Sequence, residues 1–264
     1  MTYAYIYPKR ITVAFSRLDH ELVSRNLVDS RELGKRLILA GKVTVNGHVI
    51  DKASNKVKSD DVIKIKEAPK YVSRGGFKLE EALKEFKVDP NGLICLDIGA
   101  STGGFTDCLL HHGAMKVHAY DAGTNQLSWK IRSDPRVNSR ERFNCRHLKK
   151  EDIKDQIDLI VIDVSFISLT KILPAAHAIG SSNCSIITLI KPQFELSRDE
   201  VSKGGIVKDP DLHQKSVRKI VNYATSELQL NHAGTTNSPI TGTGGNVEFL
   251  AHFTKKSHNL DNYL

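Results

Sequence analysis

The sequence predicts an α/β protein with a doubly wound sheet, preceded by a smaller α+β unit at the amino-terminal end. Three observations support this prediction. Apolar, strand-like runs alternate with helical patterns between residues 93 and 253, and a glycine-rich turn joins the first of these strands to a helix. Residues 17–66 instead combine two helical patterns with a hairpin signal. Strands separated by helices are typical of a parallel sheet with both faces covered.

The composition fits a globular protein with one ordinary domain and one small domain. The chain has 264 residues, of which 40% are hydrophobic and 26% are charged. The four cysteines, at 95, 108, 145 and 184, show no C-x-x-C spacing, so we interpret them as core residues in a reducing compartment. The first ten residues lack the apolar core of a secretory signal, and apolar runs such as 159–162 are far below the ~20 residues of a membrane span. We therefore expect a cytoplasmic protein with no membrane span.

The net charge of +8 is unevenly distributed along the sequence. Residues 1–78 hold 16 Lys and Arg against 8 Asp and Glu, whereas residues 79–264 hold 22 of each kind. A basic head on a neutral body favours binding of a polyanion, most often nucleic acid. The alternative is a basic surface that only keeps the protein soluble.

The small unit is expected at residues 17–66. Two runs with apolar residues at helical spacing come first, and Ser30-Arg31 opens the second of them. Gly41 is a natural end for that helix. Residues 42–50 then alternate around Asn46-Gly47, which predicts a hairpin, and a further strand follows at 62–65.

Residues 67–76 read as a linker because they contain a proline and end in Gly75-Gly76. The larger domain is expected at 77–254, between this linker and a tail at 255–264, and residues 1–16 are an amino-terminal extension. The strands of the larger domain are predicted at 93–98, 116–121, 158–164, 185–191 and 247–253. Its helices are predicted at 77–87, 104–112, 125–132, 168–179 and 210–228.

The glycine-rich turn is the first candidate site. Glycines at 99, 103 and 104 lie between a strand and a helix, where free backbone N–H groups can approach a ligand. The spacing is neither G-x-G-x-x-G nor that of a phosphate loop, and Asp97 with small neighbouring residues suits a ligand without phosphates. S-adenosylmethionine (SAM) is the leading candidate, and the alternative is a generic strand-to-helix turn.

Other polar residues are expected at the carboxyl ends of strands, where the ligands of such sheets bind. Asp121 closes the second strand and is placed to accept ribose hydroxyls, and Asn144 follows the third strand, where it meets an adenine edge or lies in a surface loop. Asp163 and Lys191 end two central strands, and Glu248 opens the last one. Charged groups at such positions are costly unless they are paired or solvated in a cleft, which favours a site.

Residues 17–66 resemble the S4 RNA-binding domain. The resemblance rests on Arg17-Leu18-Asp19, Ser30-Arg31, Leu37-Ile38, Ala40-Gly41, Val43, Val45-Asn46-Gly47 and Asp61. Gly34 stands where the family usually has Ala, a change that can cost a helix about 1 kcal/mol. The resemblance implies contact with structured RNA, for which the candidate residues are Arg17, Arg31, Lys35, Arg36, Lys42 and, after the domain, Arg74.

The larger domain resembles the FtsJ-like ribose methyltransferases, and the chain from 17 to 252 resembles the TlyA family, often labelled hemolysins, which joins an S4 domain to that Rossmann-like fold. The matching stretches include 71–79, 97–107, 126–130, 134–137, 163–169, 191–195, 203–205 and 245–250. The family's catalytic Lys-Asp-Lys-Glu set carries over to Lys78, Asp163, Lys191 and Glu248. The resemblance also implies SAM contacts at Asp97, Gly99, Ala100, Ser101, Thr102, Gly103, Gly104, Phe105, Asp121 and Asn144.

The resemblance implies methylation of a cytidine 2′-hydroxyl in ribosomal RNA of the small subunit, the large subunit or both. We expect Lys191 to orient the hydroxyl; a lysine can also take up the proton if it is neutral, and the sequence leaves that choice open. Asp163 would position Lys191, and Lys78 and Glu248 would frame the ribose. We expect a monomer that needs no metal. The alternatives are a membrane-active hemolysin and a non-catalytic RNA-binding factor in ribosome assembly.

Overall fold

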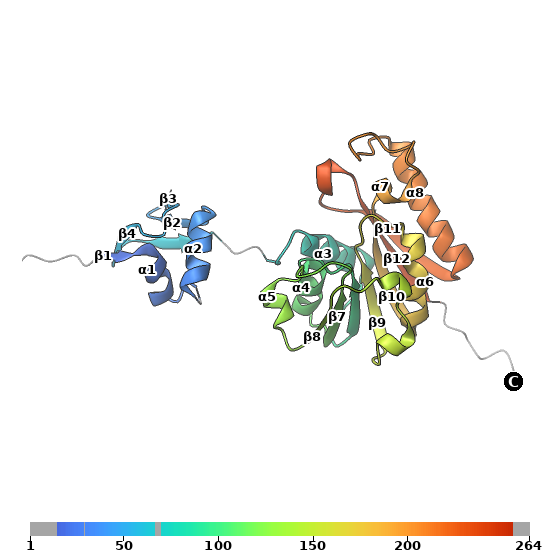
Figure 1. Ribbon diagram of the computed structural model, residues 1–264, viewed down its shortest axis with the longest axis horizontal. Helices are drawn as coiled ribbons and strands as arrows, with labels where there is room; N and C mark the ends of the chain where they lie inside the picture. The colour runs from blue at the N-terminus through green and yellow to red at the C-terminus, as the bar shows by residue number, and fades with distance from the viewer. Residues whose placement is uncertain (1–14, 29, 67–69, 256–264) are drawn as a thin grey trace, which may run out of the picture. The chain divides into compact units, whose positions relative to one another are not determined.

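The computed structural model describes residues 15–28, 30–66 and 70–255, and the chain divides into two compact units between Lys70 and Tyr71 (Figure 1). Most of the expected amino-terminal extension and of the carboxyl-terminal tail lies outside the described residues. Each unit has its own hydrophobic core.

The first unit pairs two helices with two small sheets. Its elements are β1 (Phe15–Arg17), α1 (Leu18–Ser24), α2 (Arg31–Leu39), β2 (Val43–Val45), β3 (His48–Val49), β4 (Lys56–Lys58) and β5 (Ile63–Ile65). One sheet pairs β1 with β4, and the other has the order β3-β2-β5. The side chain of Ser30 accepts a hydrogen bond from the Leu33 amide and so caps α2, as the sequence predicts.

Glycines shape this unit at two places. Asn46 and Gly47 both have positive φ, at 51° and 84°, as a tight hairpin turn between β2 and β3 requires. A Cβ on Gly34 would lie 3.3 Å from Leu22 Cδ1 and 3.5 Å from Val28 Cγ2. Gly34, which stands where the family usually has Ala, therefore lies where α2 packs closely on α1. The close packing that glycine allows here offsets its lower helix propensity.

The second unit is built on a seven-stranded sheet in the order β11-β12-β10-β9-β6-β7-β8. Its strands are β6 (Ile94–Ile98), β7 (Lys116–Tyr120), β8 (Val137–Arg140), β9 (Ile157–Ile162), β10 (Gly180–Ile190), β11 (Leu230–Asn237) and β12 (Phe249–Lys255). The five strands from β10 to β8 are parallel, whereas β12 is antiparallel to both β10 and β11. The expected doubly wound α/β fold is confirmed.

Helices cover both faces of this sheet, as Figure 1 shows. They are α3 (Gly75–Phe86), α4 (Gly104–His111), α5 (Trp129–Arg132), α6 (Leu173–Ile179), α7 (Pro192–Glu195) and α8 (Pro210–Asn222), which continues as a π-helical turn to Glu227. Successive residues of β9 alternate between two cores: Ile160 packs with α6 and α8, and Val161 packs with α3 and α4. All four cysteines are buried and free, as expected of core residues.

The structure differs from the expected linker over its second half. Tyr71 is fully buried in the core of the second unit, and Gly75 and Gly76 open α3. A Cβ on Gly76 would lie 2.3 Å from Tyr71 Cγ, so the second glycine makes room for the tyrosine ring. These glycines therefore serve close packing here.

Two strands of the sheet differ from the prediction: one was not predicted, and the other was predicted without residue bounds. The strand β11 was not predicted because its Asn, His and Thr residues make it polar, and the structure places it at a sheet edge. The third strand was expected before Asn144 without bounds, and it is β8 at the opposite edge. Because β12 is antiparallel to β10, its first residues lie at the edge where the parallel strands end.

Candidate active site

Two adjoining cavities lie at the carboxyl edge of the parallel strands. The smaller, of about 230 Å³, is lined by the glycine-rich loop together with Ser73, Arg74, Lys78 and Asp163. The larger, of about 580 Å³, extends from the same loop to the segments after β7, β8 and β9. Gly99, Ser101 and Asp163 line both cavities. A ligand in the larger cavity would therefore reach the groups around the smaller one.

The glycine-rich loop approaches its neighbours too closely for larger residues. Gly99 has φ of 86°, and a Cβ there would lie 2.3 Å from the Asp163 carbonyl oxygen. A Cβ on Gly104 would lie 2.2 Å from Ser73 Oγ. The loop thus passes directly beside the strand end that carries Asp163. Ala100, Ser101, Thr102, Gly104 and Phe105 also line the smaller cavity.

Asp97 and Gly103 support this loop from inside and line neither cavity. Asp97 is fully buried, and its carboxylate accepts a 2.6 Å hydrogen bond from Thr106 Oγ1. Burial raises the pKa of Asp97 to about 7. Gly103 has φ of 100° and packs against Leu127 and Ile131. Strand alternation turns the Asp97 side chain inward, and cofactor contact by these two residues stays a prediction.

Asp121 and Asn144 line the larger cavity, as their strand-end positions predict. The Asp121 carboxylate accepts hydrogen bonds from the amides of Ser101, at 2.8 Å, and Gly123, at 2.6 Å. Asn144 Oδ1 accepts from the Arg146 amide at 3.1 Å. An acid and an amide facing one cavity of this size fit a nucleoside with hydroxyls and a base, and the cavity volume lies in the usual range of roughly 300–1,000 Å³.

Lys191 and Asp163 form one of two lysine–carboxylate pairs. Lys191 Nζ lies 2.6 Å from Asp163 Oδ1 and donates a 2.9 Å hydrogen bond to Ser165 Oγ. Asp163 directly follows β9, and Lys191 directly follows β10. The parallel pairing of β9 and β10 brings the two side chains together. The lysine side chain is largely buried, so its ammonium position is well defined.

Lys78 and Glu248 form the second pair. Lys78 lies in α3 and donates a hydrogen bond from Nζ to Glu248 Oε2, and both side chains are buried. Glu248 directly precedes the antiparallel strand β12, which is why a residue at a strand start reaches this edge. Lys78 and Asp163 line the smaller cavity, so one member of each pair faces this space, whereas Lys191 and Glu248 line neither cavity.

The loop before Glu248 is folded around its carboxylate. A Cβ on Gly242 would lie 2.0 Å from Glu248 Oε1. Asn246 is buried, and its side chain accepts from the Val207 amide and donates to the Gly205 carbonyl, each at 2.9 Å. Asn246 thus ties the 242–248 loop to the 205–207 segment and fixes the backbone that carries Glu248.

Phe166 projects from the larger cavity wall in a strained conformation. Its φ is 64°, which is unusual for a bulky residue, and its side chain is 91% exposed. Its ring lies 5.1 Å from the Phe194 ring, centroid to centroid. Backbone strain of this kind is often retained at functional sites.

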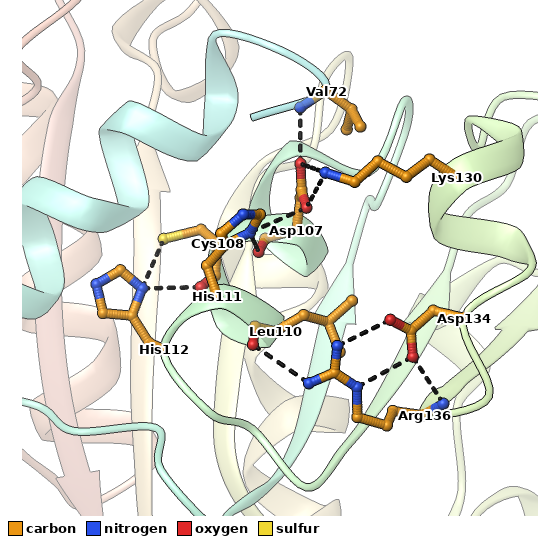
Figure 2. Close-up of polar contacts among 9 residues, drawn as sticks. All are labelled: Val72, Asp107, Cys108, Leu110, His111, His112, Lys130, Asp134 and Arg136. Atoms are coloured by element: carbon orange, nitrogen blue, oxygen red, sulfur yellow. Dashed lines mark hydrogen bonds and ion pairs between the residues drawn. The ribbon is translucent and has the colours of Figure 1, made fainter. Parts of the chain in front are cut away.

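Asp107 anchors the start of the second unit, as Figure 2 shows. It is buried in α4, and its carboxylate accepts from the Val72 amide at 2.8 Å and from Lys130 Nζ at 3.1 Å. Val72 precedes α3, which carries Lys78. The carboxylate of Asp107 therefore holds the segment that positions α3 against α4.

The expected RNA contacts in the first unit fall into two groups. Arg17 and Arg31 both bind the buried carboxylate of Asp19, at 2.9 and 2.8 Å, and hold its pKa well below the usual range. Lys35 pairs with Glu32, whereas Arg36 and Lys42 are exposed and form no ion pair within the described residues. Arg17 and Arg31 therefore have a structural partner, although about half of each side chain stays exposed. Arg74 lies on the wall of the smaller cavity.

Sequence reasoning missed Ser165, Phe166 and Asn246 as site residues. The first two lie two and three residues after Asp163, so proximity in sequence to that acid is a usable signal. Asn246 follows two glycines and precedes Glu248 by two residues, but its partners at 205 and 207 are visible only in the fold.

Each of the two units matches a known protein family. The family model described as FtsJ-like methyltransferase matches residues 71–255, and the S4 domain model matches residues 16–63. The chain is 48% identical over 242 residues to a protein named hemolysin A from Brachyspira hyodysenteriae, covering 90% of this chain and 99% of that one. It is 43% identical over 237 residues to the 16S/23S rRNA (cytidine-2'-O)-methyltransferase TlyA of Mycobacterium tuberculosis, covering 89% and 88%.

A solved structure from Lactococcus lactis, provisionally described as a hemolysin, is 51% identical with a TM-score of 0.70, covering 72% of this chain and 91% of that one. The resemblance of residues 17–66 to the S4 domain is confirmed, and so is that of the larger domain to the methyltransferases. The chain therefore belongs to the FtsJ-like methyltransferase family, in the TlyA group that carries an amino-terminal S4 domain.

Proposed function

We propose that the protein transfers a methyl group from SAM to the 2′-hydroxyl of a cytidine in ribosomal RNA. The observation that carries the proposal is the pair of lysine–carboxylate contacts, Lys78–Glu248 and Lys191–Asp163, beside a nucleoside-sized cavity. The name of the Mycobacterium relative supports the substrate and the position of the methyl group.

The fit to SAM rests on the cavity that the glycine-rich loop shares with Asp121. When bound, SAM supplies a sulfonium methyl group to a nucleophile. The carboxylate of Asp121 is placed for ribose hydroxyls, and Asn144 is placed for the base. The backbone at Gly99 and Ser101 lies between this cavity and the smaller one, where the methyl acceptor would enter.

Within the acceptor space, Lys191 holds the ribose oxygen in line with the methyl group. A ribose hydroxyl is a weak nucleophile, so orientation matters, and positioning can supply about 7–11 kcal/mol. Asp163 and Ser165 fix the lysine head. Lys78 and Glu248 frame the sugar, and the exposed ring of Phe166 offers a surface for the attached base. The hydroxyl proton leaves to water.

The first unit would deliver the RNA. Its match to the S4 domain and the excess of Lys and Arg before residue 79 both favour a structured, anionic partner. We propose that the substrate is ribosomal RNA within ribosomal subunits and that the protein acts in the cytoplasm.

The proposal is tested by incubating the full chain with methyl-labelled SAM and purified ribosomal subunits. We expect label in ribose 2′-O-methyl groups with the wild type and none with Lys191→Ala. Absence of label in the RNA of both proteins would contradict the proposal.

Membrane lysis remains the competing activity, because one relative carries the name hemolysin A. Across residues 15–28, 30–66 and 70–255, no helix is both long and apolar enough to cross a bilayer. Lysis of red cells by the purified protein, retained in Lys191→Ala, would favour this activity.

A further inference from the structure

Trp129 lies on the surface of the second unit without a structural task. It is 79% exposed in α5, and among the described residues its indole makes no hydrogen bond and no ring contact. A single exposed apolar residue is common, so its surroundings decide what it indicates.

Those surroundings are basic. Residues 128–154 hold nine Lys and Arg against four Asp and Glu, although residues 79–264 as a whole are balanced at 22 of each. The positive charge of this segment is therefore balanced by negative charge elsewhere in residues 79–264. This segment runs from α5 through β8 to the loops that precede β9.

In the ion pairs of this segment the base is the more exposed partner, and of its four acids only Glu151 is exposed. The Lys130 side chain is 60% exposed and its partner Asp107 is 2% exposed. Arg136 is likewise more exposed than Asp134, and Arg140 more than Asp152. Five further cations are exposed and form no ion pair within the described residues. They are Arg142, Arg146, Lys149, Lys150 and Lys154.

This surface is continuous with the cofactor cavity. The strand β8 is an edge of the sheet, and Figure 1 shows α5 beside it. The guanidinium of Arg140 stacks on the Phe143 ring at 3.8 Å. Phe143 and Asn144 line the larger cavity. An extended partner on this surface would therefore pass beside the site.

We propose that the β8 edge, defined by Trp129, Lys130, Arg136, Arg140, Arg146, Lys149 and Lys150, is a second contact surface for the substrate RNA. The proposal rests on the proposed function. An exposed aromatic ring among cations fits nucleic acid, since a base stacks on the ring and phosphates meet the ammonium and guanidinium groups. A protein partner would require more exposed apolar area than Trp129 alone. The alternative task for these charges is to keep an edge strand from pairing with another chain.

The test compares full-length variants for binding of purified ribosomal RNA at several salt concentrations. Trp129→Ala removes the ring, and a triple change, Arg146→Gln, Lys149→Gln and Lys150→Gln, removes charges that hold no ion pair. The matched controls are Met115→Ala, at an equally isolated exposed apolar residue, and the double change Lys84→Gln and Lys87→Gln, at cations near the end of α3. Thermal unfolding and SAM affinity are measured for every variant.

We expect Trp129→Ala to weaken RNA binding about 5- to 100-fold, as base stacking on an aromatic ring would give. The triple change should lower the slope of log affinity against log salt by about 2. The controls, the unfolding temperatures and SAM affinity should match the wild type. Wild-type RNA affinity and salt slope in both β8-edge variants would overturn this proposal and leave the proposed function standing. Loss of RNA binding in these variants, with a wild type that binds RNA but methylates no ribose, would support the surface and contradict the proposed function.

Discussion

Lys191 and Asp163 meet at 2.6 Å although they follow different strands, because β9 and β10 run parallel and end side by side. Lys78 and Glu248 meet in the same region by another route, through a helix and an antiparallel strand. Four residues that are 170 positions apart at the extremes thus form two ion pairs, and one member of each pair, Lys78 and Asp163, lines the smaller cavity. This convergence is the basis of the proposed chemistry.

Replacing Lys191 by Ala should slow methyl transfer strongly and leave SAM affinity unchanged. The ammonium group contacts Asp163 and Ser165 and lines no part of the larger cavity. We expect kcat to fall by about 10²–10⁴-fold, the range for a positioned proton-transfer or orienting group. SAM affinity, measured by calorimetry, should stay within about twofold of the wild type. A variant that loses SAM binding as well would place Lys191 in the cofactor site instead.

Replacing Gly99 by Ala should damage the glycine-rich loop beyond the cost of its positive φ. Gly92 is the matched control, since its φ is 73° and nothing lies within 4 Å of an added Cβ. We expect Gly92→Ala to cost about 1–2 kcal/mol of stability with normal SAM affinity. Gly99→Ala, whose Cβ would lie 2.3 Å from the Asp163 carbonyl, should cost a further ~1–3 kcal/mol and weaken SAM binding roughly tenfold or more. Equal losses in both variants would contradict the close approach.

Replacing Gly242 by Ala should displace the Glu248 carboxylate without unfolding the protein. The added Cβ would lie 2.0 Å from Glu248 Oε1, and the end of a side chain can move where backbone cannot. We expect kcat to fall by about 10²-fold through misplacement of the Lys78–Glu248 pair, with unchanged SAM affinity. Gly204→Ala is the control, because nothing lies within 4 Å of its added Cβ. Full activity in Gly242→Ala would argue that the position of Glu248 is unimportant.

The buried Asp97 should make stability depend on pH in a defined window. Its folded-state pKa is raised to about 7, so the folded chain keeps a proton that the unfolded chain releases above about pH 4. The stability that Asp97 contributes is therefore complete below about pH 4 and is lost as the pH rises through about 7.

The isosteric change Asp97→Asn removes this titration and keeps every other titratable group of the chain. Between about pH 4 and pH 7 the unfolding free energy of the wild type should fall, relative to Asp97→Asn, by up to about 4 kcal/mol. Urea unfolding at several pH values measures this difference. A difference that stays constant across the window would contradict the burial argument.

Replacing Phe166 by Gly should separate stability from activity. Glycine tolerates the φ of 64°, so the free energy of unfolding should rise by about 1 kcal/mol, while the KM for RNA rises and SAM affinity stays unchanged. Lys87→Gly is the control, since Lys87 is exposed with φ of 54° at the end of α3. The control should gain stability and keep the KM of the wild type. An unchanged KM in Phe166→Gly would remove the ring from substrate binding.

The fold was predictable where the sequence pattern and the three-dimensional environment agree. The central strands are apolar because both faces are covered, and the Asn46-Gly47 turn has the positive φ values that its residues favour. The strand β11 was not predictable from apolar content, since an edge strand can be polar. The pair Gly75-Gly76 was interpreted as part of a linker. The sequence could not show that the Tyr71 ring packs against Gly76, which only the fold reveals.

Asp163, Lys191 and Glu248 were foreseen by type and strand position, and Lys78 only through the family resemblance. The supporting residues Ser165 and Asn246 were not foreseen. Ser165 accepts a hydrogen bond from Lys191, and Asn246 bonds to backbone groups that lie 39 and 41 positions away in the sequence. No local sequence pattern indicates such contacts. The inward orientation of Asp97 follows from the alternation of side chains along β6. The glycine motif alone gives no indication of this orientation.

The central claim is ribose methylation of ribosomal RNA, and mapping 2′-O-methyl groups in this RNA tests it most directly. The comparison uses cells with the gene, cells without it, and cells that express only Lys191→Ala. We predict at least one cytidine that carries a 2′-O-methyl group in the first cells alone. Identical ribose methylation in all three would contradict the account.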